Sequence, residues 1–202
     1  MSVCAVPLRN MLIDAVMRER RSVRAFLPTP VSQEAVAQIL SVAASAPSGT
    51  NTQPWHVIAV AGEARKRLCD RVLHAFHHEE GEQQSEYDIC PAEFFEPYLT
   101  RRRRCGFALY AAVGISKGDT DAMRAQHARN FAFFDAPVGL IFTLDRRMVQ
   151  SSWVDYGMFL QNIMLAARAR GLDTCSQMAW TLYPRLLAEA LQIPDGQMVL
   201  CG

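Results

Sequence analysis

The apolar residues of this chain change their spacing several times, between the three-to-four-residue spacing of an amphipathic helix and the short runs of a buried strand. Val36, Ile39 and Leu40 lie on one helical stripe, whereas residues 137–144 form an almost continuous apolar run. No internal repeat or low-complexity segment interrupts the 202 residues. This pattern predicts a mixture of α-helices and β-strands. A chain of this length buries roughly 70% of its unfolded surface without staples, so a single domain, residues 1–202, is expected.

Capping residues, prolines and glycines set the expected element boundaries. Ser32 and Ser152 are the predicted N-caps of two helices, with Asp155 at the N3 position of the second. The acidic, proline-containing stretch 79–97 predicts a loop, the first part of an excursion at about 79–116. We expect helices at 12–21, 32–46, 63–76, 98–115, 121–134, 152–170 and from Pro184, strands at 55–60, 137–144 and 198–201, and a short strand and turn at 172–178.

Charge and composition exclude several classes of function. Twenty-one basic residues against 20 acidic ones give a net charge of +1, which provides no long-range field for nucleic acid or an anionic membrane. No apolar run approaches the ~18 residues of a membrane-spanning helix, and the amino end lacks a secretory core, so a cytoplasmic location is expected. The cysteines form no C-x-x-C pair, which argues against a zinc cluster or a disulfide framework. They are Cys4, Cys69, Cys90, Cys105, Cys175 and Cys201.

The first segment that carries chemistry is Arg20–Arg24, with the sequence R-R-S-V-R. In an extended stretch after a helix, alternate side chains lie on one face, where guanidinium groups and a hydroxyl can hold a phosphate. Taken alone, the run also suits a solvated basic turn.

The second segment is residues 46–55, with the sequence A-P-S-G-T-N-T-Q-P-W. Its small residues permit close approach of the backbone, and its hydroxyls and carboxamides can hydrogen-bond the edge of a planar heterocycle without adding charge. A turn-rich loop that joins a helix to a strand is the alternative interpretation.

Together and in this order, the two segments resemble the nitroreductase family of FMN-dependent oxidoreductases. Further similarity lies in F-D-A-P-V-G-L-I at 134–141, in the helix from Trp153 with Gly157 and Gln161-Asn162, and in G-L-D-T-C-S-Q at 171–177. With the excursion at 79–116, the chain is most similar to the nitrobenzoate and related nitroaromatic reductases of this family.

The resemblance implies an α+β fold with a mainly antiparallel sheet, in an intertwined homodimer that holds two FMN molecules at its interface. The first segment would bind the phosphate and ribityl chain, and the second would reach the flavin from the other subunit. The turn at 176–178 would present backbone N–H groups to flavin N5. The residues implied are Arg20, Arg21, Ser22, Arg24, Pro47, Ser48, Gly49, Asn51, Gln53, Ser176, Gln177 and Met178.

The expected activity is transfer of hydride from NADH or NADPH through flavin N5 to nitroaromatic or similar electron-poor aromatic compounds, by a ping-pong cycle. Arg24 near N1 would favour the reduced flavin, and the protein need supply no acid, base or nucleophile of its own. Quinone, enone or flavin reduction and reductive dehalogenation remain open, as does a flavin-binding protein without turnover. Members of the family usually continue beyond Met198–Gly202 into a tail, so an apparently missing tail predicts weaker FMN binding.

Other residues support weaker alternatives. Arg101–Arg104 suits a solvated or interface helix face, or contact with a carboxylate substrate or a dinucleotide phosphate. The histidines at 74, 77 and 78 suit an exposed helix end rather than a metal site, because no third ligand is near. Cys105 or Cys175 with His127 would make a thiol enzyme, although buried structural cysteines are the simpler interpretation.

Aromatic residues in the segment 131–134 are expected in the core, and one of them could cover a substrate cavity. Arg129 is either a further flavin contact or a member of a surface ion pair.

Overall fold

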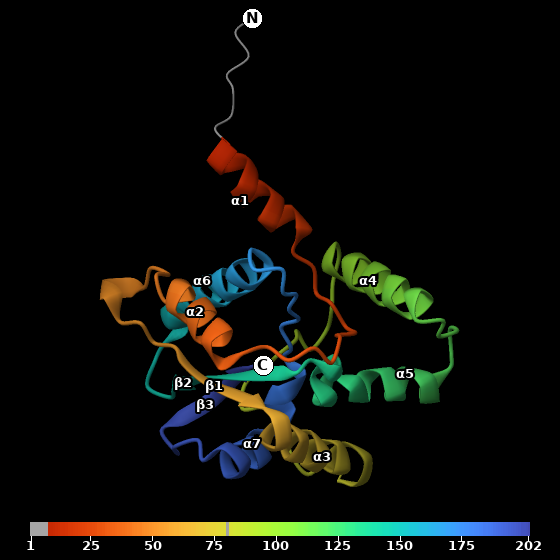
Figure 1. Ribbon diagram of the computed structural model, residues 1–202. Coiled ribbons are helices and arrows are strands. Elements are labelled where there is room, and N and C mark those ends of the chain that lie inside the picture. Colours follow the sequence, from red (N-terminus) through yellow and green to blue (C-terminus); the bar gives the residue numbers. More distant parts are fainter. Residues whose placement is uncertain (1–7, 80) are drawn as a thin grey trace, which may run out of the picture.

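The computed structural model describes residues 8–79 and 81–202, so Cys4 and Glu80 lie outside the described residues. Its centre is a three-stranded antiparallel sheet in the order β1-β2-β3 (Figure 1). The strands are β1 (His56–Ala61), β2 (Val138–Asp145) and β3 (Gln197–Cys201). β1 pairs with β2 from His56 opposite Thr143 to Ala61 opposite Val138. The predicted α+β class with an antiparallel sheet is confirmed, as are three of the four expected strands.

Helices cover both faces of this sheet (Figure 1). On one face α2 (Gln33–Ala43) and α6 (Gln150–Arg168) pack against Phe142 and Leu144 of β2. On the other face α3 (Gly62–His78) and α7 (Pro184–Leu191) pack against Val60 and Ile141. Because neighbouring strand residues point to opposite faces, each face receives alternate apolar side chains of β2.

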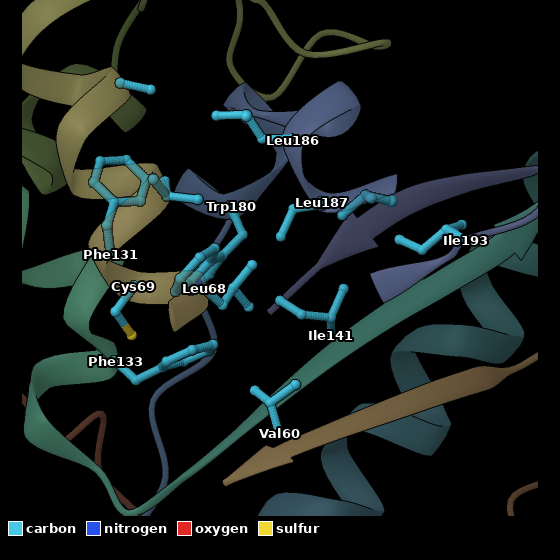
Figure 2. Packing of buried hydrophobic residues seen from close by; sticks show 13 residues of the cluster. Val60, Leu68, Cys69, Phe131, Phe133, Ile141, Trp180, Leu186, Leu187 and Ile193 are labelled. Atoms are coloured by element: carbon cyan, nitrogen blue, oxygen red, sulfur yellow. The ribbon is translucent and has the colours of Figure 1, made fainter. Parts of the chain in front are cut away.

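Aromatic rings fill the α3 and α7 side of the core, as Figure 2 shows. The Trp180 ring stacks on Phe133, with ring centres 4.2 Å apart, and meets Phe131 edge-on at 5.8 Å. A side chain at Gly139 would place its Cβ 2.3 Å from the Phe133 ring, so the strand needs glycine there. Phe131, Phe133 and Phe134 are all buried, which confirms the core interpretation of these residues.

The two predicted N-caps have different outcomes. Ser32 caps α2, and its hydroxyl accepts a hydrogen bond from the Ala35 amide at 3.1 Å. The predicted Ser152 cap is wrong, because α6 begins two residues earlier and Ser152 is buried inside its first turn. Asp155 is therefore not a capping residue, and its carboxylate bonds to a distant loop instead.

Two further expectations are wrong in extent. The helix predicted at 121–134 is shorter in the structure, where α5 (Thr120–Ala128) ends at Ala128. The chain then continues as the 3₁₀ segment η2 (Arg129–Asp135). Phe133, Phe134 and Asp135 have left-handed backbone angles, which an α-helix does not accommodate. The short strand and turn expected at 172–178 is reduced to an isolated parallel bridge between Thr174 and Ser22, after which the chain turns towards the end of β3, so the turn is present and the strand is not.

The excursion begins as the predicted loop. Its first part runs beside β3 and α7, where Glu86 pairs with Arg146 at 2.6 Å and the Tyr87 hydroxyl donates to the Leu200 carbonyl. Then follows α4 (Tyr98–Ala112), in which no residue is buried. At the amino-terminal end of the described chain, α1 (Leu8–Glu19) projects from the body (Figure 1) and is tied to α6 by the Glu19–Arg168 ion pair at 3.0 Å. Within residues 8–79 and 81–202, no helix combines the length and apolarity needed to cross a bilayer.

Candidate functional site

The first predicted segment is extended, as expected, and lies beside the turn that precedes η3 (Ala179–Leu182). Ser22 bridges Thr174 in parallel, and the Val23 amide donates to the Thr174 carbonyl at 3.1 Å. The Arg24 guanidinium folds back and donates to the Ser22 carbonyl at 3.3 Å. The structure therefore brings Ser22 and Arg24 together on a backbone that is fixed to the 171–177 turn.

The guanidinium groups of Arg20 and Arg24 lie near the Cys175 thiol. Burial raises the pKa of this thiol, and the positive charges of Arg24 and Arg20 act against that rise. Both arginines are half-buried, whereas Arg21 is exposed. No carboxylate of the described chain lies within ion-pair distance of these three arginines. Their charge is therefore available to an anion.

A cavity of about 460 Å³ adjoins this segment. Its walls come from residues 23–31, α2, the start of β2, α6 and the turn 171–177, and they are mostly apolar. Thr174 lines it, and the buried Thr174 hydroxyl has no hydrogen-bond partner in the described chain. An apolar hollow of this volume, with guanidinium groups beside it and an unpartnered hydroxyl in its wall, suits a planar ligand that carries a phosphate.

The turn at 176–178 is only partly available to such a ligand. The Gln177 side chain is buried, where it donates to the Asn130 carbonyl at 2.8 Å and accepts from the Trp180 indole at 3.2 Å. The Gln177 amide donates to the Gly202 carbonyl at 2.6 Å. Ser176 lines the cavity and Met178 is exposed. In this turn, Gln177 therefore serves the fold, and the neighbouring residues border the cavity and solvent.

The second predicted segment joins α2 to β1 and contains the 3₁₀ turn η1 (Gly49–Asn51). The Gln53 amide donates to the Ser48 hydroxyl at 2.9 Å, and the Gly49 amide donates to the Asp155 carboxylate at 3.2 Å. Gly49, Asn51 and Gln53 are exposed. The loop thus has a defined shape and presents its carboxamide side chains to solvent in this chain.

The two segments lie at opposite ends of α6. The first is near the end of the helix, where Arg168 pairs with Asp173, and the second is held by Asp155 near the beginning. Thirteen helical residues span about 20 Å. Figure 1 shows the loop between α2 and β1 on the opposite side of the molecule from the segment that follows α1. Among the described residues that line the cavity, none belongs to the loop 47–53.

The remaining candidates mostly have structural environments. Arg129 pairs with Asp135 at 2.9 Å, as in the ion-pair alternative. His127 packs against Phe76 and Phe131. In the part of the chain that the structure describes, no three histidine, cysteine or acidic side chains lie together as a metal site would need.

The Arg101–Arg104 run lies exposed on α4. The Arg102 guanidinium lies over the Phe94 ring at 4.6 Å and the Arg101 guanidinium over the Tyr98 ring at 5.9 Å. Two of the acidic residues that precede the run bond elsewhere: Glu86 to Arg146, and Glu96 to Thr100, from whose hydroxyl it accepts a hydrogen bond. None of the ion pairs among the described residues involves Arg101–Arg104. Neighbouring acidic residues therefore do not neutralise these arginines within the described chain.

Sequence reasoning missed Thr174 and the role of Asp155. Thr174 carried no sequence indication beyond its place in the 171–177 motif. Asp155 was visible only as the third residue after a serine, a pattern typical of helix N-termini, and its bond to Gly49 spans 106 residues.

Comparison with known proteins places this arrangement among flavoproteins. A family model described as the nitroreductase family matches residues 17–202. The nitrobenzene nitroreductase of Ectopseudomonas oleovorans is 47% identical over 190 residues, which cover 94% of this chain and 84% of that protein. The 4-nitrobenzoate reductase of Pseudomonas putida is 41% identical over the same share of this chain and 82% of its own length.

Two solved structures are similar to this chain over most of its length. The crystal structure of the FMN and NADPH-dependent nitroreductase NfnB from Sphigopyxis sp. strain HMH has a TM-score of 0.90 and 37% identity, and covers 94% of this chain and 85% of that one. The FMN-dependent NfnB of Mycobacterium smegmatis in complex with NADPH has a TM-score of 0.89 and 30% identity, and covers 96% and 86%.

Proposed function

The chain belongs to the nitroreductase family, and from that premise we propose that it is an FMN-dependent oxidoreductase that reduces nitroaromatic compounds with electrons from NADPH. The observation that carries the proposal is the arrangement of Arg20 and Arg24 beside the cavity, near the C-terminal end of α6. Two half-buried guanidinium groups free of carboxylate partners in the described chain stand beside an apolar cavity with an unpartnered hydroxyl in its wall. The names of the similar enzymes, with FMN, NADPH and nitroaromatic substrates, support the same assignment.

In this proposal the first segment holds the phosphate end of FMN. Arg20 and Arg24 supply charge-assisted hydrogen bonds, the Ser22 hydroxyl supplies a further donor, and Arg21 lies at the exposed edge. Pairing with Thr174 keeps the segment extended, so these groups need little rearrangement when the phosphate arrives. The Thr174 hydroxyl then gains the hydrogen-bond partner that it lacks.

The cavity holds the flavin ring between the turn at 176–178 and the apolar wall of α2 and α6. FMN, when bound, supplies the hydride chemistry, accepting two electrons from a nicotinamide and passing them to an electron-poor acceptor. The chain's own contribution is to bind, to orient and to exclude water from the ring. Since donor and acceptor would use one cavity in turn, we expect ping-pong kinetics.

The second segment completes the site from the partner subunit of a homodimer. Pro47, Ser48 and Gly49 would line the flavin, and the carboxamides of Asn51 and Gln53 would face its polar edge. Support comes from the separation of about 20 Å along α6. Exposed apolar side chains offer a surface for the dimer, among them Leu12 at 67% and Val154 at 66% exposure.

The arginine run of α4 suits the phosphate groups of NADPH. Four adjacent guanidinium groups repel one another and gain no carboxylate partner in the described chain, so an external anion would relieve that repulsion. The 2′-phosphate distinguishes NADPH from NADH. We expect Arg101→Ala with Arg104→Ala to raise the KM for NADPH more than that for NADH.

Anaerobic stopped-flow spectroscopy tests the proposal. The purified protein should be yellow, NADPH should bleach its flavin absorbance, and a second mixing with nitrobenzene should restore it. Flavin that NADPH does not reduce would contradict the enzyme assignment and favour a binding protein. Flavin that NADPH reduces but that a quinone reoxidises much faster than nitrobenzene would contradict the nitroaromatic substrate class.

A further inference from the structure

We infer that Asp155 is a positioning residue of the flavin site: through the Gly49 amide it fixes the loop 47–53 against α6, in the place where the loop meets the partner's flavin. This inference deepens the proposed function and rests on it. Asp155 is 8% exposed, lies in the second turn of α6, and accepts a hydrogen bond from Gly49 at 3.2 Å. A buried carboxylate is costly unless it serves a partner, so its bond to an exposed loop calls for an explanation.

The loop that Asp155 holds is conformationally strained. Thr50, Asn51 and Gln53 have φ angles of 49°, 60° and 47°, in the left-handed region that residues with a side chain rarely adopt. Such angles are unfavourable for residues with a side chain, and they persist only where the surroundings enforce them. The loop therefore needs anchors, and strain of this kind gathers at binding sites.

Most of the anchors lie within the loop itself. The Gln53 amide donates to the Ser48 hydroxyl, the Asn51 amide to the Ser48 carbonyl at 2.9 Å, and the Thr52 amide to the Gly49 carbonyl at 3.1 Å. Among the hydrogen bonds of residues 47–53 in the described chain, the bond to Asp155 is the one that comes from another element. The internal bonds set the shape of the loop, and Asp155 sets its place relative to α6.

The geometry of one peptide explains how a single bond can do this. In a trans peptide, the N–H of one residue and the C=O of the residue before it point in opposite directions. The plane between Ser48 and Gly49 has both groups engaged, its N–H by Asp155 and its C=O by the Asn51 amide. Without the carboxylate, only the Asn51 amide still holds this plane, so the plane can tilt relative to α6 and the direction of Asn51 and Gln53 is less well fixed.

The test compares Asp155→Ala with Asp155→Asn, in which the amide oxygen can still accept the Gly49 N–H. Thr143→Val is the matched control: Thr143 is also buried, and its hydroxyl bonds to Gln197, away from the loop. Hydrogen exchange on the FMN-free protein should speed up in peptides that cover 46–55 in the alanine variant, and remain near wild type in the other two.

Fluorescence titration then measures the effect on FMN. We expect the alanine variant to bind FMN roughly tenfold or more weakly, the loss of one hydrogen bond to a charged group. The asparagine variant should recover most of this affinity, and the control should retain wild-type affinity even where its melting temperature falls. Unchanged exchange and unchanged affinity in the alanine variant would overturn the inference while leaving the proposed function intact. Failure of the wild-type protein to bind FMN would overturn both.

Discussion

Each flavin site is proposed to take its phosphate clamp from one subunit and its loop from the other, and mixed dimers can test this directly. One chain carries Ser22→Ala with Arg24→Ala, and the other carries Asn51→Ala with Gln53→Ala. In a mixed dimer, one site combines the intact clamp of the second chain with the intact loop of the first. The other site has neither.

The size of the expected effect follows from the contacts. A hydrogen bond to a charged group contributes about 1.5–3 kcal/mol, so loss of both clamp residues should weaken FMN binding roughly 100-fold or more. The pure clamp variant should therefore remain free of FMN at concentrations that just saturate the wild type. The pure loop variant, which loses two uncharged hydrogen bonds of about 0.5–1.5 kcal/mol each, should bind FMN roughly tenfold or more weakly. Because the two segments are about 20 Å apart along α6, we expect one FMN per mixed dimer.

Co-expression with two affinity tags isolates the mixed dimers, and absorbance after removal of free flavin counts the bound FMN. The reciprocal control pairs a wild-type chain with a chain that carries all four substitutions. If sites form across subunits, this pair has no intact site and binds no FMN. One FMN in the control together with none in the complementing pair would refute the cross-subunit assignment, as would a protein that stays monomeric on a sizing column.

Two further predictions concern titrating groups. Thiol reagents should label the exposed Cys90 and Cys105 quickly. Cys69 and Cys201 should react only after unfolding, because burial raises the pKa of the Cys69 thiol to about 11 and that of the Cys201 thiol to about 12. Peptide mass spectrometry measures the labelling, and rapid modification of Cys201 in the folded protein would contradict its buried position. Desolvation lowers the pKa of His127, and a nearby guanidinium lowers it further. Between the two pKa values the unfolded chain is protonated at this histidine and the folded chain is not. The free energy of unfolding should therefore fall as the pH drops below about 6.5. Denaturant melts of the His127→Phe variant should show a smaller fall over that range, and an equal fall would assign the pH dependence to other groups.

Local patterns predicted most of the fold because the residues that fix them are neighbours in the chain. Ser32 caps α2 through an amide three residues away, and Pro184 begins α7 where its missing N–H costs nothing. The apolar run 137–144 indicates a strand, and β2 (Val138–Asp145) is that strand, with most of its residues buried. Helical periodicity failed at 129–135, where Phe133, Phe134 and Asp135 adopt left-handed angles that no local pattern indicates, and where Phe131 and Phe133 pack against Trp180 in the core.

The two segments of the site could be predicted from the sequence, but their positions relative to the rest of the fold could not. The composition of the two segments indicated a phosphate clamp and a polar loop, and the extended form of the clamp is confirmed. The contacts that hold them were not visible, because Thr174 lies 152 residues from Ser22 and Asp155 lies 106 residues from Gly49. At such separations sequence spacing carries no information on contact. Only local spacing is informative, and that spacing predicts a helix cap for Ser152 and Asp155.

The two segments lie beside opposite ends of α6, and this separation affects assembly. One rigid helix sets the distance between clamp and loop within a chain, so neither can approach the other by a local movement. A flavin that bridges the clamp of one subunit and the loop of its partner binds the dimer and not the monomer. By linkage, such a ligand must stabilise the dimer by as much as dimerisation strengthens its binding. The apparent affinity for FMN should therefore rise with protein concentration until the dimer is fully formed, and weakening the Gly49–Asp155 bond should shift both equilibria together.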